Sequence, residues 1–148
     1  RYERRLVHLL SETDYEALLR ACREFSRRTA NGELKRTSYV LHPGLPLAWF
    51  VRYHPDPEVA SLPPEILDAA PLTISADERG RVWLASRLIP RQGVVAYPED
   101  YLDYNDYMGA VELVPGLWYY DEEYGPNHPE WVRYINELLE KGKHFQKE

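Results

Sequence analysis

The sequence predicts an α+β fold: an antiparallel or mixed sheet of about six to seven short strands, two long helices near the ends of the chain, and one or two short helices. Three observations predict it. Apolar residues recur at helical spacing near both ends, and β-branched and aromatic runs separated by turn residues fill the middle. The length of 148 residues suits one domain, so we expect residues 1–148 to form a single globular unit.

The first long helix is predicted to begin near Thr13. Thr13 and Glu16 have the spacing of a capping box, and Asn31-Gly32 supplies a stop signal. The apolar residues between these signals follow the i, i+3, i+4, i+7 pattern of one helix face: Tyr15, Leu18, Leu19, Cys22 and Phe25.

The last long helix is predicted to begin at Pro129 and to end at Gly142, because proline favours the first turn and glycine the end of a helix. Its apolar face is expected to consist of Trp131, Tyr134, Ile135, Leu138 and Leu139.

Strands are predicted between these helices. Three hairpins are expected from paired apolar runs around tight turns: 37–42 with 47–53, 72–76 with 81–89, and 110–114 with 117–121. A further short strand is expected at 93–97, and short helices at 61–70 and from Pro98 to Gly109.

Charge is distributed unevenly along the chain. The stretch 92–132 holds nine acidic residues and no Lys or Arg, whereas the whole chain has a net charge of −6. Nucleic acid is therefore a poor partner for this stretch, because the phosphates would be repelled.

Several common chemistries are excluded by the absence of their motifs. The sequence has no phosphate-binding glycine loop, no G-x-S-x-G elbow and no H-E-x-x-H pair. Cys22 is the single cysteine, so neither an intramolecular disulfide nor a multi-thiolate zinc site can form within one chain. On the apolar face of its helix, the Cys22 thiol is expected to be an inert packing group.

Membrane insertion is not expected. No run approaches the roughly 18 apolar residues that cross a bilayer, and no charged-then-apolar leader is visible at the start, which begins at Arg1 rather than Met. The lack of a long apolar run and of a visible leader favours a cytoplasmic protein, whereas the start at Arg1 does not add to this inference.

Tyrosine is concentrated in the acidic stretch, which holds seven of the 12 tyrosines. Tyr119 and Tyr120 must point to opposite faces of a strand, so we expect one ring in the core and the other within reach of solvent. Phenol rings beside carboxylates suit a Lys- or Arg-bearing surface. The sequence thus predicts a non-catalytic recognition domain with no cofactor, whose face at 97–124 binds through Tyr101, Tyr104, Tyr119, Tyr120, Tyr124, Asp103 and Glu122.

The predicted partner is a basic protein or peptide surface, or another copy of the chain. Self-association is allowed because the first long helix carries Arg20, Arg23, Arg27 and Arg28, which could meet the acidic stretch of a second molecule.

A small metal-dependent hydrolase is the alternative hypothesis. Asp121 and Glu123 lie on the same face of an extended strand, and His128 is close enough in sequence to fold back toward them. Two carboxylates and an imidazole can hold a divalent metal ion. A solvated turn at the end of a strand explains the same residues without any site.

Overall fold

A computed structural model of the chain describes residues 2–41, 56–88, 91–101, 110–122 and 128–147. They form one six-stranded sheet in the order β1-β2-β3-β4-β6-β5, with every strand pair antiparallel. The α+β prediction is confirmed. The strands are β1 (Ser38–Val40), β2 (Thr73–Ala76), β3 (Val82–Leu88), β4 (Arg91–Ala96), β5 (Val111–Val114) and β6 (Leu117–Asp121).

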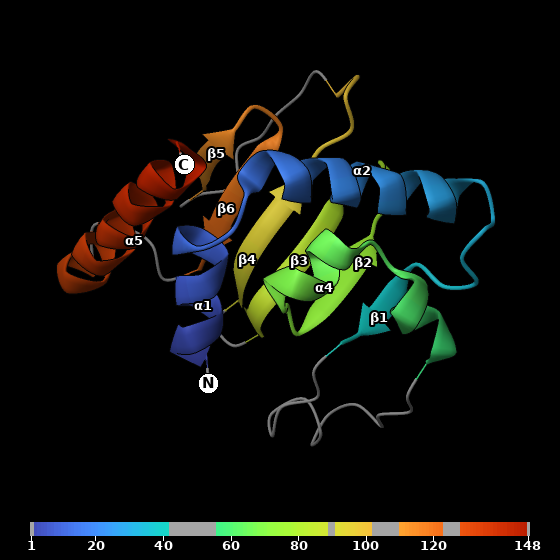
Figure 1. The fold of residues 1–148 in the computed structure, drawn as a ribbon, viewed down its shortest axis with the longest axis horizontal. Helices are drawn as coiled ribbons and strands as arrows, with labels where there is room; N and C mark the ends of the chain where they lie inside the picture. Colours follow the sequence, from blue (N-terminus) through green and yellow to red (C-terminus); the bar gives the residue numbers. More distant parts are fainter. Residues whose placement is uncertain (1, 42–55, 89–90, 102–109, 123–127, 148) are drawn as a thin grey trace.

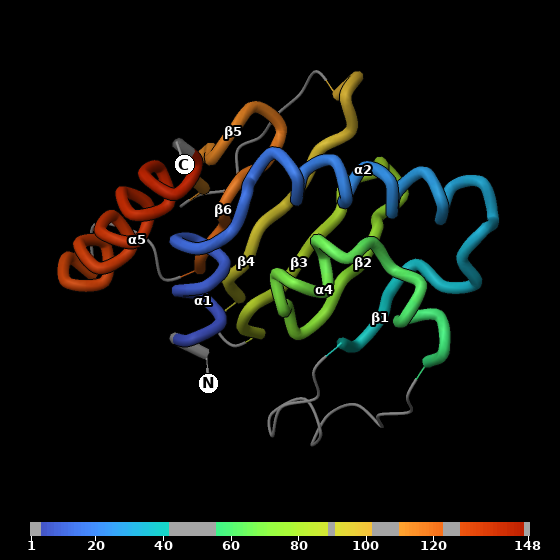
Figure 2. Tube along the Cα trace, in the orientation of Figure 1, coloured from blue at the N-terminus to red at the C-terminus, as the bar shows by residue number. Residues whose placement is uncertain are grey.

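Helices cover one face of this sheet (Figure 1). The chain path in Figure 2 places α1 between α5 and α4, with α2 crossing above them and α5 beside the β6–β5 end of the sheet. The helices are α1 (Tyr2–Ser11), α2 (Tyr15–Ala30), the 3-10 helix η1 (Pro57–Ser61), α4 (Pro64–Ala69) and α5 (Pro129–Lys147).

The N-terminal region contains two helices where the sequence predicted one. The predicted capping box is wrong: the α2 N-cap is Asp14, whose carboxylate accepts a hydrogen bond from the Ala17 backbone N–H at 3.1 Å. The Thr13 hydroxyl instead donates to the His8 carbonyl at 2.8 Å, at the end of α1. The predicted stop is confirmed, because α2 ends at Asn31.

The sheet places one row of apolar side chains under the helices. In the pairing register, Tyr39, Ile74, Leu84, Val94 and Tyr119 lie opposite one another from β1 to β6, and all five are buried. They pack with α2 and α4 in the main core, apart from Tyr119, which joins a second cluster formed by α1 and α5. Burial of this row is what holds the helices on one face.

Two of the predicted hairpins are confirmed, namely β2 with β3 and β5 with β6. In the β2–β3 turn, the Asp77 carboxylate accepts hydrogen bonds from the backbone N–H groups of Arg79 and Arg81, from the Arg81 Nε and from the Trp83 indole. The hairpin of 37–42 with 47–53 lies partly outside the described residues, and β1 pairs with β2.

The predicted helix at 61–70 is present as α4, whereas residues 98–101 form a turn, and residues 102–109 lie outside the described ranges.

Helix α5 does not end at Gly142 as predicted but continues to Lys147. Gly142 is needed for packing: a Cβ there would lie under 3.0 Å from the Leu10 carbonyl oxygen and from the Tyr15 hydroxyl. One turn later, the Gln146 side chain accepts from the Tyr15 backbone N–H at 2.8 Å and donates to the Thr13 carbonyl at 2.7 Å. The C-terminal half of α5 is therefore fixed against the α1–α2 junction.

Within the described parts of the chain, none of the helices combines the length and the apolar surface that crossing a lipid bilayer requires.

Candidate functional site

The two neighbouring tyrosines of β6 point to opposite faces, as predicted, but neither is accessible to solvent. Tyr119 is 0% exposed and Tyr120 is 2% exposed. Tyr119 packs with α1 and α5, and its hydroxyl donates to the Asp121 carboxylate. Tyr120 lies in a small cluster on the other face, with its ring 5.2 Å from that of Trp83. The expectation of one solvent-accessible ring is wrong, because β6 is an inner strand with side chains packed on both faces.

The remaining residues of the predicted partner-binding face are divided. Tyr101 is half-buried, with its ring centroid 4.8 Å from that of Tyr97. Glu122 is exposed, and its carboxylate accepts a hydrogen bond from the Arg91 backbone N–H. The other three predicted residues lie outside the described ranges: Asp103, Tyr104 and Tyr124. Where this face is described, its aromatic rings thus pack inward and Glu122 faces solvent.

The metal hypothesis rested on Asp121, Glu123 and His128. Asp121 is only 1% exposed and accepts hydrogen bonds from the Trp131 indole at 2.9 Å, from the Gln92 amide at 3.3 Å and from the Tyr119 hydroxyl. These bonds tie β6 to the first turn of α5.

His128 is exposed just before α5, and Glu123 lies outside the described residues. Among the residues that the structure places, no group of three or more His, Cys, Asp and Glu side chains could hold a metal ion.

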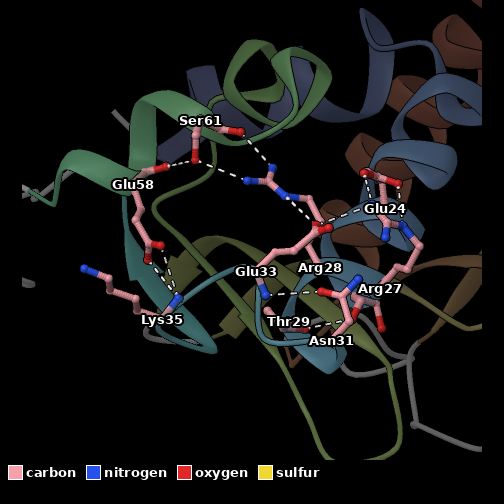
Figure 3. Close-up of polar contacts among 10 residues, drawn as sticks. Glu24, Arg27, Arg28, Thr29, Asn31, Glu33, Lys35, Glu58 and Ser61 are labelled. Atoms are coloured by element: carbon pink, nitrogen blue, oxygen red, sulfur yellow. Dashed lines mark hydrogen bonds and ion pairs between the residues drawn. The ribbon is translucent and has the colours of Figure 1, made fainter.

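Three of the four arginines of α2 contact other residues of the chain, as Figure 3 shows for Arg27 and Arg28, whereas Arg20 is exposed. Arg27 pairs with Glu24 at 2.7 Å, and Arg28 donates to the Ser61 carbonyl at 2.8 Å. The Arg23 Nε donates to the Tyr97 carbonyl at 3.0 Å. These contacts involve three of the four arginines on which the self-association hypothesis rested.

A groove lies between strand β5 and the C-terminal half of α5. Its volume is ≈ 300 Å³, and Tyr15 lines it from the α1–α2 junction. Three consecutive residues of β5 line one side, Val111, Glu112 and Leu113, and four residues of α5 line the other, Asn136, Leu139, Glu140 and Lys143. Because side chains alternate along a strand, three consecutive lining residues mean that the β5 backbone itself borders the groove.

Strand β5 is the last strand of the sheet. In the described part of the chain it pairs with β6 on one side and with no strand on the other. An edge strand presents a row of backbone N–H and C=O groups that can pair with another chain. The groove therefore combines a hydrogen-bonding edge with an apolar wall formed by Val111, Leu113 and Leu139.

The rim of the groove is acidic. Glu112 is exposed, and no side chain among the described residues forms an ion pair with it. Across the groove, Glu140 pairs with Lys143 at 3.3 Å. The residues bordering the groove thus include two acids and one base, with Glu112 on the β5 strand itself, so a cationic ligand is favoured over an anionic one.

Hydrogen bonds fix the α5 wall of the groove at both ends of the helix. The Asp121–Trp131 hydrogen bond fixes its first turn, and Gln146 fixes its last turn. Tyr15 is buried where it lines the groove, and burial raises the pKa of its phenol, which is neutral at physiological pH in any case, to about 12. A groove between rigid elements needs little reorganisation to receive a ligand.

Sequence patterns predicted β5, the acidity around it and the start of α5, but not that these elements meet. The groove brings residues 111–113 and residues 136–143 to opposite sides of one space, although they are distant in the sequence. The one local signal was Gly142, which was interpreted as a helix end.

No family model matches the chain, and neither a curated protein nor a solved structure is significantly similar to it.

Proposed function

We propose that this chain is a non-catalytic recognition domain that binds an extended, basic segment of a partner protein in the groove between β5 and α5. The observation that carries the proposal is the β5 backbone edge beside an apolar wall and an acidic rim. The proposal keeps the basic partner expected from the sequence and moves the binding surface from the tyrosine rings to β5.

Strand addition is the binding mode that this geometry supports best. In strand addition, an extended peptide pairs with an exposed sheet edge, its backbone supplies much of the affinity, and pockets for alternate side chains supply specificity. Strand β5 is four residues long, and the groove of ≈ 300 Å³ runs beside it. Such a volume is at the low end of ligand pockets, about 300–1,000 Å³, so it fits a few side chains of an extended segment.

Charge supports a basic segment as the occupant. Glu112 lies on the strand to which the segment would pair, and the stretch 92–132 around it has no Lys or Arg. An opposite charge directly across a strand pair stabilises the pairing, and a like charge destabilises it.

A second copy is disfavoured on the same ground. Pairing two β5 strands about a two-fold axis brings the Glu112 carboxylates of the two copies toward each other.

The proposal can be tested with a fluorescein-labelled short peptide of alternating Val and Arg, measured by fluorescence anisotropy. We expect saturable binding that weakens with added salt. Glu112→Lys should weaken it at least about tenfold, because it replaces attraction by repulsion at the paired strand.

The matched control is Glu137→Lys, which makes the same charge change at an exposed position of α5 outside the groove. Affinity within about twofold of the wild type is expected for this control. Equal weakening by both substitutions would show attraction to overall charge and would contradict the site.

Backbone pairing has its own test. The same peptide is methylated either on all Val amides or on all Arg amides, because neighbouring residues of a strand direct their N–H groups to opposite edges. One of the two methylated peptides should lose binding and the other should keep it. If both bind as well as the unmethylated peptide, strand addition is wrong. A dimer of the free protein that this peptide dissociates would instead identify a second copy as the natural occupant.

A further inference from the structure

We infer that strand β5 and the groove beside it together select a side-chain pattern, in which a basic residue opposite Glu112 is flanked on each side by an apolar residue that faces the groove. This inference rests on the proposed function and states which basic segments the groove accepts. The cavities and charged clusters elsewhere in the described structure offer no comparable combination of strand edge, apolar wall and uncompensated charge.

The pattern follows first from the register of β5. Val111 is opposite Tyr119, whose ring packs against α1 and α5, so Val111 is on the helix-covered side of the sheet. Glu112 is opposite Trp118, which packs in the cluster on the other side. Residues directly opposite each other in neighbouring strands have side chains on the same face. A segment added to β5 therefore sends the residue opposite Val111 toward α5 and the residue opposite Glu112 away from it.

Strand β5 contains a β-bulge, which adds an apolar residue to its helix-covered side. The register shifts between Glu112 and Val114, so Leu113 is the additional residue. Leu113 is partly buried and packs against both clusters on the helix side. Positions of the added segment before and after the residue opposite Glu112 thus both face the groove.

The chemistry of the two sides differs. Toward α5, the added side chains meet Val111, Leu113 and Leu139, which favour apolar residues because contact removes apolar surface from water. On the other side, the residue opposite Glu112 meets a carboxylate for which the described residues provide no ion-pair partner. Lys or Arg is favoured there. The readable unit is apolar, basic, apolar.

The experiment compares two peptides of identical composition: alternating Val and Arg, and a block of Val followed by a block of Arg. Both have the same charge, so attraction to an acidic surface alone gives equal affinities. We expect the alternating peptide to bind at least about tenfold more tightly.

Exchanging the charges of the protein and the peptide tests whether Glu112 recognises the basic residue at the centre of the pattern. The Glu112→Lys variant should bind an alternating Val–Glu peptide more tightly than the wild type does, because a carboxylate then meets an ammonium group. The Glu137→Lys variant, with the same net charge, should not gain this affinity. Circular dichroism of each variant checks that the fold is retained, as expected for exposed positions.

The outcomes separate the two proposals. If the wild type binds neither Val–Arg peptide, the proposed function is wrong. Equal affinities for the alternating and block peptides, with both weakened by Glu112→Lys and not by Glu137→Lys, would leave the groove as the site and overturn the pattern. Tighter binding of the alternating peptide without the charge exchange at Glu112 would also overturn it, since another residue would then read the basic side chain.

Discussion

Replacing Gly142 by Ala tests the contact that positions α5 beside β5. A Cβ at this position would lie under 3.0 Å from the Leu10 carbonyl oxygen and the Tyr15 hydroxyl, and 3.1 Å from the Tyr15 ring carbon Cζ. Real Cβ atoms essentially never approach a heavy atom within 3.0 Å. One obstacle is backbone and the other is a buried ring, so neither can easily move aside.

The expected change in the free energy of unfolding comes from one stabilising and two destabilising effects of the substitution. Ala is favoured over Gly within a helix by about 1 kcal/mol. Forcing a methyl group into a packed interior costs about 1–3 kcal/mol. Displacing the Tyr15 hydroxyl from the Leu10 carbonyl removes a hydrogen bond worth about 0.5–1.5 kcal/mol. The free energy of unfolding should therefore fall by about 0.5–3.5 kcal/mol, compared with the roughly 5–15 kcal/mol typical of a domain.

Urea unfolding followed by circular dichroism measures this change. Gly142→Ala should lower the midpoint concentration with little change in slope. The control is Lys141→Ala, an exposed neighbour in the same helix, for which a change within about 0.5 kcal/mol is expected. If Gly142→Ala is as stable as the wild type or more stable, helix propensity dominates, and α5 does not pack on the α1–α2 junction as described.

Three further predictions follow from buried or hydrogen-bonded groups. Tyr119→Ala and Tyr120→Ala should each lower the free energy of unfolding by about 3–5 kcal/mol in urea titrations, because both rings are buried; a small loss for either would place that ring at the surface. Burial raises the pKa of the Cys22 thiol to about 12, so a thiol reagent should react at pH 8 only in denaturant, and rapid labelling of the folded protein would contradict the packing. Partial burial raises the pKa of Asp77, but the hydrogen bonds that its carboxylate accepts in the β2–β3 turn outweigh this effect, so the pKa is lower than usual. The ionised form of Asp77 therefore stabilises the fold at pH 7, and this stabilisation is lost as the pH falls below about 4. Asp77→Asn should therefore lower the melting temperature more at pH 7 than at pH 2, and an equal loss at both would exclude the ionised form as the cause.

Local signals predicted the elements whose ends are chemically marked. Asn31 ends α2 and Pro129 begins α5, as their sequence context indicated. Helix α1 was missed because the capping-box spacing at Thr13 led to the prediction that the first helix begins there. Leu6, Leu9 and Leu10 in α1 also follow helical spacing, and all three are buried. The role of Gly142 depends on Tyr15, a residue far away in sequence, and no local pattern reveals it.

The candidate site was predictable only in part. The acidity of the stretch around β5 is visible in the sequence, but it assigned binding to Asp103 and Glu122 and did not distinguish Glu112 from the other acids. The burial of Tyr120 depends on the strand order, in which β6 lies between β4 and β5. Strand order is a long-range property, as is the packing of α5 beside β5, so Tyr119 and Tyr120 were assigned to a binding face although both rings are buried.

The most direct test of recognition at the β5–α5 groove is a ¹H–¹⁵N NMR titration of the whole chain with the alternating Val–Arg peptide. The largest saturable shift changes should occur at the backbone amides of Val111, Glu112 and Leu113, followed by those of Leu139 and Lys143 across the groove. The Glu112→Lys variant should require a higher peptide concentration for the same changes. Changes centred instead on α2 or on the residues following His128, or changes that grow linearly without saturation, would contradict a binding site in the groove.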